Sequence, residues 1–156
     1  SLKMFSREEK KSLNTAFFNQ FVRHMSRHHS KGGGGGRWES YKTGVKGLYF
    51  RLLTAPIVGI AIDIQQKDPE IRALLYDQFL ELRRLLEAEW GDKVNYEHSH
   101  YLESGLEVSR ISIKLDNVYF YDKEQWTEIL NWFEMNLLGL DAFWYTVGDI
   151  VKGLAR

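Results

Sequence analysis

Asp63, Gln65 and Lys67 are the residues whose spacing comes nearest to a catalytic arrangement. They occupy alternate positions at the end of a segment rich in isoleucine, and alternate side chains of an extended strand point to the same side of a sheet. A carboxylate and an amide oxygen could bind Mg²⁺, and a lysine beside them could assist an attacking water molecule. This spacing therefore indicates metal-dependent hydrolysis.

The same spacing is similar to the metal site of restriction-type nucleases of the PD-(D/E)XK class, in which a glutamine sometimes replaces the second acid. Those enzymes also take an acid from a neighbouring strand, whereas the adjacent segment here offers only Tyr49 and Arg51. We therefore assign no catalytic residue, and a degenerate metal-dependent nuclease is the alternative function.

A larger set of polar side chains should share that face of the sheet. Arginine, lysine, tyrosine and glutamine on rigid strands suit the recognition of phosphate, carboxylate or a nucleic-acid backbone. Gly59 and Ala61 would leave a shallow depression among them. The alternative is a solvated face on which Asp63 forms cross-strand ion pairs with Arg51 or Arg110. The residues expected on this face are Tyr49, Arg51, Asp63, Gln65, Arg110, Ser112 and Lys114.

A second candidate binding segment lies at residues 37–46. Arg37 and Lys42 alternate there with the aromatic residues Trp38 and Tyr41, a composition that stacks bases while it screens phosphates. The favoured alternative is that both aromatic side chains anchor the end of a loop to the core.

Histidine pairs are the remaining candidates for metal chemistry. His24 and His28 are four residues apart, and His98 and His100 two apart, spacings that a metal ion can bridge. Neither pair includes the glutamate of a His-Glu-x-x-His motif. We therefore expect no metal site, and motifs for nucleotide or dinucleotide cofactors are also absent from the sequence.

The secondary structure that positions these residues follows from hydrophobic periodicity. Apolar residues recur about every four positions in residues 7–27, 68–91, 122–139 and 141–154, which predicts four helices. Alternating patterns predict two hairpins, over 45–65 and 95–115. The expected fold is α+β, with a four-stranded antiparallel sheet in the order α-ββ-α-ββ-α-α and helices packed on one face.

The whole chain, 1–156, should form a single domain. Residues 30–37 interrupt it with five consecutive glycines, which predicts a flexible loop because glycine loses the most backbone entropy on ordering. Aromatic residues are dense near the C-terminal end, and we expect Trp126, Trp132, Phe133, Phe143, Trp144 and Tyr145 to exceed what one small core can hide.

Composition narrows the class of protein further. The chain has no cysteine, which excludes disulfides and thiolate chemistry, and no apolar run near the length of a membrane span. A cytoplasmic protein is expected. The net charge is zero, but residues 1–51 hold eleven Lys/Arg and three Asp/Glu, so the N-terminal third is basic and could meet phosphate or an acidic partner.

Four segments together resemble a bacterial domain family of unknown function. They are Met4–Lys11, Tyr41–Lys46, Ile60–Gln65 and Leu140–Trp144. Members of that family are free-standing proteins of about this length, or terminal modules sometimes fused to restriction-type nuclease domains. The resemblance implies a shared fold and a link to DNA processing, and it brings no catalytic residues.

The leading hypothesis is thus a non-enzymatic binding or accessory module, whose polar sheet face and basic N-terminal third engage nucleic acid or a protein partner. The nuclease based on Asp63, Gln65 and Lys67 is the alternative, and a structural homodimer is a third reading based on the C-terminal aromatic residues.

Overall fold

Four antiparallel strands form one sheet in the order β1-β2-β4-β3. The computed structural model describes residues 4–33 and 36–156, and Gly34 and Gly35 of the expected loop lie outside this part. The first and second strands form one hairpin, the third and fourth form another, and β2 pairs with β4 between them. All three pairings are antiparallel, as predicted. The strands are β1 (Leu48–Leu53), β2 (Val58–Ile64), β3 (Asn95–Tyr101) and β4 (Glu107–Leu115).

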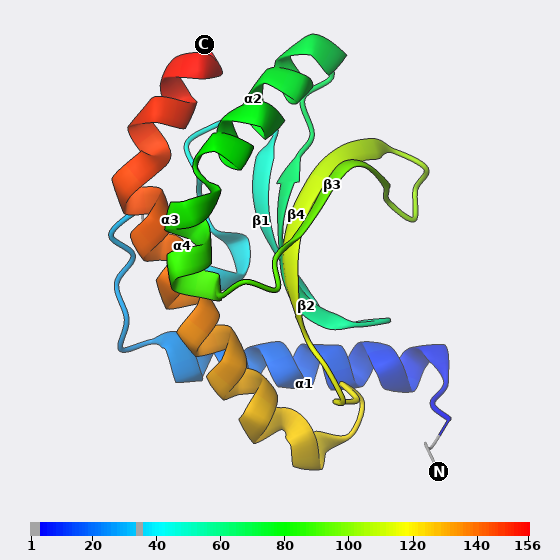
Figure 1. Cartoon of the computed structure of the whole chain (residues 1–156). Coiled ribbons are helices and arrows are strands. Elements are labelled where there is room, and N and C mark those ends of the chain that lie inside the picture. Colours follow the sequence, from blue (N-terminus) through cyan, green and yellow to red (C-terminus); the bar gives the residue numbers. More distant parts are fainter. Residues whose placement is uncertain (1–3, 34–35) are drawn as a thin grey trace.

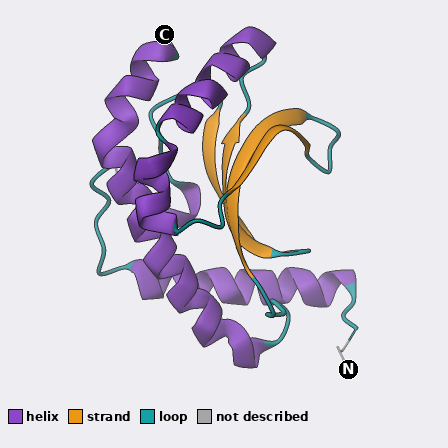
Figure 2. Ribbon diagram, in the orientation of Figure 1, coloured by secondary structure: helices purple, strands orange, loops and turns teal. Residues whose placement is uncertain are grey.

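Helices cover one face of this sheet, which confirms the predicted α+β fold. Figure 1 shows the second and third helices one after the other, with the last helix alongside them on the same side of the sheet, while the first helix crosses below the lower end of the sheet. The opposite face curves into a concave surface, visible in the ribbon of Figure 2. The helices are α1 (Arg7–Met25), α2 (Pro69–Glu81), α3 (Arg83–Trp90) and α4 (Trp126–Leu154), with short 3-10 turns η1 (Trp38–Ser40) and η2 (Lys123–Gln125).

Local sequence signals set where the first two helices begin. The side chain of Ser6 accepts a hydrogen bond from the backbone N–H of Glu9, whose own side chain accepts one from Ser6 N–H. This reciprocal capping satisfies two backbone donors that the first turn leaves unpaired. Asp68 caps α2 in a similar way, and Pro69 takes the first helical position.

The core lies between the helices and the covered face of the sheet. Ile60, Ile62 and Ile64 alternate along β2 and are fully buried, and aromatic side chains from α1 and α4 pack against the same core. Phe17 alone contacts four other aromatic rings from α1, α4 and the segment before it, in addition to its neighbour Phe18. Every residue of β2 is buried, including Ala61 and Asp63 on the opposite face, so the expected solvated face is not exposed at this strand; alternation correctly assigns the isoleucines to the face that packs against the helices.

Two predicted helix boundaries differ from the structure. The expected helix over 68–91 breaks at Leu82, and the break redirects α3 along α4, where Trp90 donates a hydrogen bond to the carbonyl of Asn136 (3.0 Å). Conversely, α4 runs through Gly139 and Asp141 without interruption. Gly139 is not a helix stop: a β-carbon there would lie 3.2 Å from Cβ of Glu89 on α3, so glycine allows the two helices to approach closely.

Among the described residues, no helix has the length and hydropathy needed to cross a membrane.

Candidate functional site

One row of polar side chains runs across all four strands on the open face of the sheet. In the strand register Tyr49 pairs with Asp63, Asp63 with Arg110, and Arg110 with Glu97. Directly paired residues of antiparallel strands place their side chains on the same face. The predicted grouping of Tyr49, Asp63 and Arg110 is therefore present, and Glu97 extends it to β3.

Asp63 is the centre of this row and is fully buried. Its Oδ1 accepts a hydrogen bond from Arg110 Nε (2.7 Å), and its Oδ2 accepts one from Arg110 Nη2 (2.8 Å) and one from Arg51 Nη1 (2.5 Å). A buried carboxylate is tolerated when its charge is paired and its lone pairs are satisfied. One acid thus holds two guanidinium groups, and Glu97, paired with Arg110 across β3 and β4, brings a second negative charge to the same row.

Arg51 is more exposed than Arg110 and has further partners. Its Nη2 donates to Oε1 of Gln65 (2.8 Å), and its guanidinium lies 4.7 Å from the centre of the Tyr49 ring. The Tyr49 side chain is 43% exposed. The cross-strand ion pairs considered as the alternative are therefore present, together with an exposed tyrosine–arginine stack.

Small residues occupy the second and third rows of the open face. Ala61 lies between Arg51 and Ser112, and Gly59 lies between Leu53 and Lys114. A β-carbon on Gly59 would come within 2.5 Å of the carbonyl oxygen of Ile113. Glycine is therefore required there by the close approach of β2 and β4. With only Gly59 and Ala61 at its centre, the open face has no protruding side chain there.

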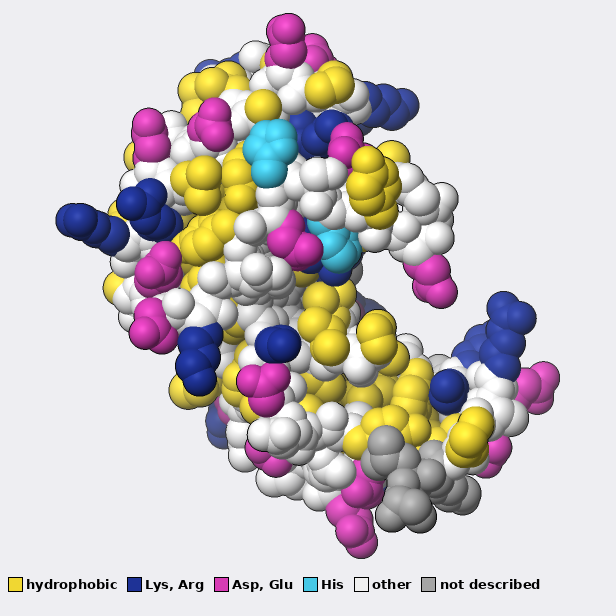
Figure 3. Space-filling view, turned by 45° about the vertical axis from the view of Figure 1, so that its right-hand side comes forward, with side chains coloured by type: hydrophobic (Ala, Val, Ile, Leu, Met, Phe, Trp, Pro, Cys, Tyr) yellow, Lys and Arg dark blue, Asp and Glu magenta, His cyan; other side chains and the backbone are white. Residues whose placement is uncertain are grey.

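The resulting hollow is a groove of about 580 Å³, here called the open-face groove. Figure 3 shows the molecule notched on this side, between the β3–β4 hairpin above and the end of the molecule that contains α1 below. Apolar side chains such as Leu53 and Ile57 form part of its wall. Its polar lining comprises Lys93, Asn95, Glu97, His100, Arg110, Ser112 and Lys114.

The electrostatics of the open-face groove favour an anion. Among the described residues that line it, Lys93, Arg110 and Lys114 are cationic and Glu97 is the one acid; Lys114 Nζ also lies 3.7 Å from Oδ1 of Asp116. The hydrogen bond and nearby charge of Asp63 raise the pKa of Arg110 against the opposing effect of burial. Within the described residues, Nη1 of Arg110 makes no hydrogen bond, so this rigidly held guanidinium keeps donor capacity for a ligand.

The nuclease-like residues are arranged differently from a metal site. Both oxygens of Asp63 accept hydrogen bonds from arginine, and Gln65 accepts one from Arg51. Strand β2 ends at Ile64, and Lys67 lies exposed in the bend that leads to α2. Across residues 4–33 and 36–156, no cluster of three or more His, Asp or Glu side chains is placed to hold a metal ion.

The aromatic residues of segment 37–46 anchor it to the rest of the fold. Trp38 is buried and donates from Nε1 to the carbonyl of His28 (3.3 Å). Tyr41 is half-buried and donates from its hydroxyl to Asp141 on α4 (2.5 Å). Arg37 and Lys42 remain exposed, but they have no aromatic partner free to stack beside them in this segment.

Asp141 also holds the start of the glycine-rich loop. Its carboxylate accepts hydrogen bonds from the Ser30 hydroxyl (2.6 Å) and from the backbone N–H groups of Lys31 (2.8 Å) and Gly32 (2.9 Å). Burial would raise the pKa of Asp141, but these bonds and that of Tyr41 lower it overall. The described part of the loop is thus tied to α4. Sequence reasoning missed this role because Asp141 read as the cap of a new helix.

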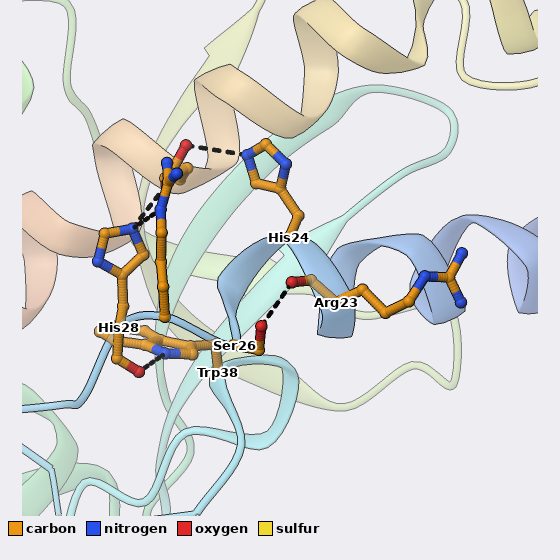
Figure 4. A network of polar contacts seen from close by, with 7 residues as sticks. Arg23, His24, Ser26, His28 and Trp38 are labelled. Atoms are coloured by element: carbon orange, nitrogen blue, oxygen red, sulfur yellow. Dashed lines mark hydrogen bonds and ion pairs between the residues drawn. The ribbon is translucent and has the colours of Figure 1, made fainter.

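The N-terminal histidines contact a carboxylate. His24 Nε2 lies 2.9 Å from Oε1 of Glu134, and His28 Nε2 lies 2.6 Å from Oε2. Arg27 Nη2 donates to the same Oε2 (2.6 Å). Figure 4 shows His24 and His28 reaching toward α4 from the end of α1. Burial would raise the pKa of Glu134, but the three partners outweigh it and lower the pKa to about 2.

These contacts also explain part of the uneven charge along the chain. Arg27 and Arg51 of the basic third pair with Glu134 and Asp63 of the acidic remainder. The aromatic side chains near the C-terminal end are mostly accommodated by the core: Trp126, Phe133, Phe143 and Trp144 are all buried there. The premise of the homodimer reading is therefore wrong for these four, although Tyr145 is exposed.

Fold and site together define an α+β domain with an arginine-centred groove on its uncovered sheet face. The model of the family described as Domain of unknown function (DUF4268) matches residues 13–147, and the chain belongs to that family. The expected membership of a family without an assigned function is confirmed. Neither a curated protein nor a solved structure matches the chain.

Proposed function

We propose that this protein is a non-enzymatic module that binds the phosphodiester backbone of nucleic acid in the open-face groove. The observation that supports the proposal is that the Arg110 guanidinium is held in a fixed orientation and, in the described part of the chain, still has a free donor. Asp63 fixes this guanidinium through two hydrogen bonds, while Nη1 remains available within the described residues and Lys93 and Lys114 line the same groove. Arginine in a fixed orientation suits a phosphate because its planar donors match two phosphate oxygens.

The exposed ring of Tyr49 adds a second type of contact. It lies on the same sheet face, with Arg51 stacked on it at 4.7 Å. Bases of single strands stack on aromatic rings without regard to sequence. A single strand could therefore place phosphates near Arg110 and a base near Tyr49, whereas a duplex offers no free base. We expect single-stranded nucleic acid to bind more tightly than a duplex.

The test is fluorescence anisotropy with a labelled single-stranded 20-mer and its duplex, at low and at physiological salt. We expect affinity to fall steeply with salt, because phosphate contacts release counterions. Lys93→Ala and Lys114→Ala should each weaken binding several-fold and flatten the salt dependence by roughly one charge. Arg84→Ala is the control, because Arg84 is exposed on α3 on the helix-covered side.

Two results would refute the proposal. One is the absence of binding to either nucleic acid at low salt. The other is binding that Arg84→Ala weakens as much as Lys93→Ala and Lys114→Ala do, which would indicate general charge attraction. A cytoplasmic location, where nucleic acid is accessible, belongs to the same proposal and can be tested by fractionation of cells that express the protein.

A further inference from the structure

Among the described residues, the outer edge of β1 carries backbone groups for which no hydrogen-bond partner is present. Gln65 N–H donates to the carbonyl of Gly47, so in this antiparallel register the residues at 49, 51 and 53 also bond to β2. Phe50 and Leu52 therefore direct their N–H and C=O groups away from the sheet. Leu48, which has the same parity, confirms this geometry because its N–H and C=O bond to Val45 and Thr43 outside the sheet.

The other edge of the sheet, β3, is protected against pairing with a further strand, whereas the edge of β1 is not. The β3–β4 pairing shifts register between Glu97 and His100, and the hydroxyl of Ser109 donates to the carbonyl of His98 in this irregular stretch. Bulges of this kind prevent an edge from pairing with another chain. Strand β1 has a regular register throughout its six residues.

A groove of about 430 Å³, here called the edge groove, runs along β1. Phe18 of α1 lines it, as do Phe50 and Leu52 of the strand and Glu39 and Tyr41 of the preceding segment. It thus has a strand edge on one side and a helix residue on the other. Extended peptides bind other proteins in grooves of this construction by adding a strand to the sheet.

Glu39 indicates the charge of the occupant. Its Oε1 is buried and has no hydrogen-bond partner within residues 4–33 and 36–156. The Nε atom of Arg37 is 4.0 Å away, and the Arg37 side chain is itself largely exposed. A buried carboxylate oxygen without a donor is unfavourable. The Glu39 side chain as a whole is 19% exposed, so a lysine or arginine side chain delivered into the groove would approach it and supply the opposite charge.

We propose that the edge groove binds an extended peptide segment of a partner protein, which adds to β1 as a fifth strand and places a basic side chain at Glu39. Phe50 and Leu52 supply four backbone groups to this strand, two donors and two acceptors. The edge groove meets the open-face groove at Leu53 and is also lined by Tyr49, but Lys93 and Lys114 line the open-face groove and not this one. Peptide binding here goes beyond the proposed binding of nucleic acid.

The test uses three synthetic nonapeptides of alternating threonine and valine that carry lysine, glutamine or glutamate at the centre. We expect the lysine peptide to bind best and the glutamate peptide worst. Glu39→Gln should weaken the lysine peptide about tenfold and leave the glutamine peptide unchanged. Leu52→Pro removes an outward N–H, which edge strands tolerate, and it also shortens a side chain that packs against the core. It should abolish binding of all three peptides while the protein stays folded. Leu52→Val is its control.

Amide hydrogen exchange in the wild-type protein gives an independent measurement. Without peptide, the Phe50 and Leu52 amides should exchange far faster than those of Tyr49 and Arg51, and the lysine peptide should slow them. The proposal is overturned if no peptide binds, or if all three bind equally well. It is also overturned if Phe50 and Leu52 become protected as the protein concentration alone rises, because a second copy would then cover the edge. Nucleic-acid binding should survive in Glu39→Gln, which separates the two proposals.

Discussion

Asp63 and Arg110 occupy directly paired positions of β2 and β4, and both oxygens of the carboxylate accept hydrogen bonds from the one guanidinium. Such a two-point contact fixes the orientation of the arginine as well as its distance. Arg51 approaches the same carboxylate from β1 with a single bond. The three strands at this point are therefore joined by side chains in addition to their backbone hydrogen bonds.

The two arginines should differ in their contribution to stability. Arg51→Ala leaves Asp63 with its two-point partner and should cost about 1.5 kcal/mol. Arg110→Ala leaves the buried carboxylate with one bond and should cost about 3 kcal/mol, and Asp63→Ala should cost roughly 3–5 kcal/mol because it leaves both guanidinium groups without their acid. Urea unfolding measures the order. A larger loss for Arg51→Ala than for Arg110→Ala would contradict this account.

Glu134 should make stability depend on pH under acidic conditions. Its pKa is about 2 in the folded protein, against 4.5 for an ordinary glutamate, so the unfolded chain binds a proton more readily. The stabilisation is complete above pH 4.5 and is lost as the pH falls toward 2. Glu134→Gln should cost roughly 2 kcal/mol at pH 7.

The measurement is urea unfolding of the wild type and of Glu134→Gln at pH 6, 4 and 3. The difference between the two proteins should be smaller at pH 3 than at pH 6, because in the wild type the unfolded chain protonates Glu134 before the folded protein does. If the difference in free energy of unfolding stayed constant over this range, His24, Arg27 and His28 would not be stabilising the ionised carboxylate of Glu134.

Asp141 should control the order of the segment that precedes the glycine run. Asp141→Asn keeps the shape of the side chain but removes its charge and one of its acceptor oxygens, so the Ser30 hydroxyl and the Lys31 and Gly32 amides lose part of their bonding. We expect faster amide exchange at Lys31 and Gly32 and faster proteolysis after Lys31. Tyr41→Phe, which removes one donor only, should have a smaller effect. Equal exchange in Asp141→Asn and wild type would refute this role.

Two glycines offer a matched pair of alanine substitutions with opposite expected signs. In Gly32→Ala the β-carbon would lie 2.5 Å from the carbonyl oxygen of Asp141 and 2.6 Å from the amide nitrogen of Tyr145, both backbone atoms that cannot move aside. It should destabilise the protein by about 1–3 kcal/mol. Gly153 lies in α4 with open space around it, so Gly153→Ala should stabilise by roughly 0.5–1 kcal/mol. Thermal unfolding compares the two, and a loss of stability in both would contradict the packing argument.

The sheet could be read from the sequence because strand periodicity is local. The alternation of Ile60, Ile62 and Ile64 with Ala61 and Asp63 settles which side chains face the helices, and the short hairpins then fix the register. The grouping of charged residues on the open face followed from the same alternation. The depth of the open-face groove could not be predicted, because the curvature of the sheet depends on how all four strands pack.

The ionic contacts of α4 could not be predicted in this way. Glu134 and Asp141 bind residues more than one hundred positions away along the chain, and no local pattern records such partners. The sequence around Asp141 instead has the features of a helix start, because the acid comes two residues after Gly139. Tertiary contacts with Ser30 and Tyr41 give the acid a different role and allow one helix to continue.

Glu134 and Asp141 are seven residues apart, so they lie on the same side of α4, two turns and about 10 Å from each other. One clamps the C-terminal end of α1 and the other clamps the segment that follows it. The helix bearing Phe18 is therefore held at a set position beside β1 before any ligand arrives. An incoming strand would enter an edge groove that is already in its binding conformation. The conformational freedom lost by the incoming strand would then dominate the entropic cost of association.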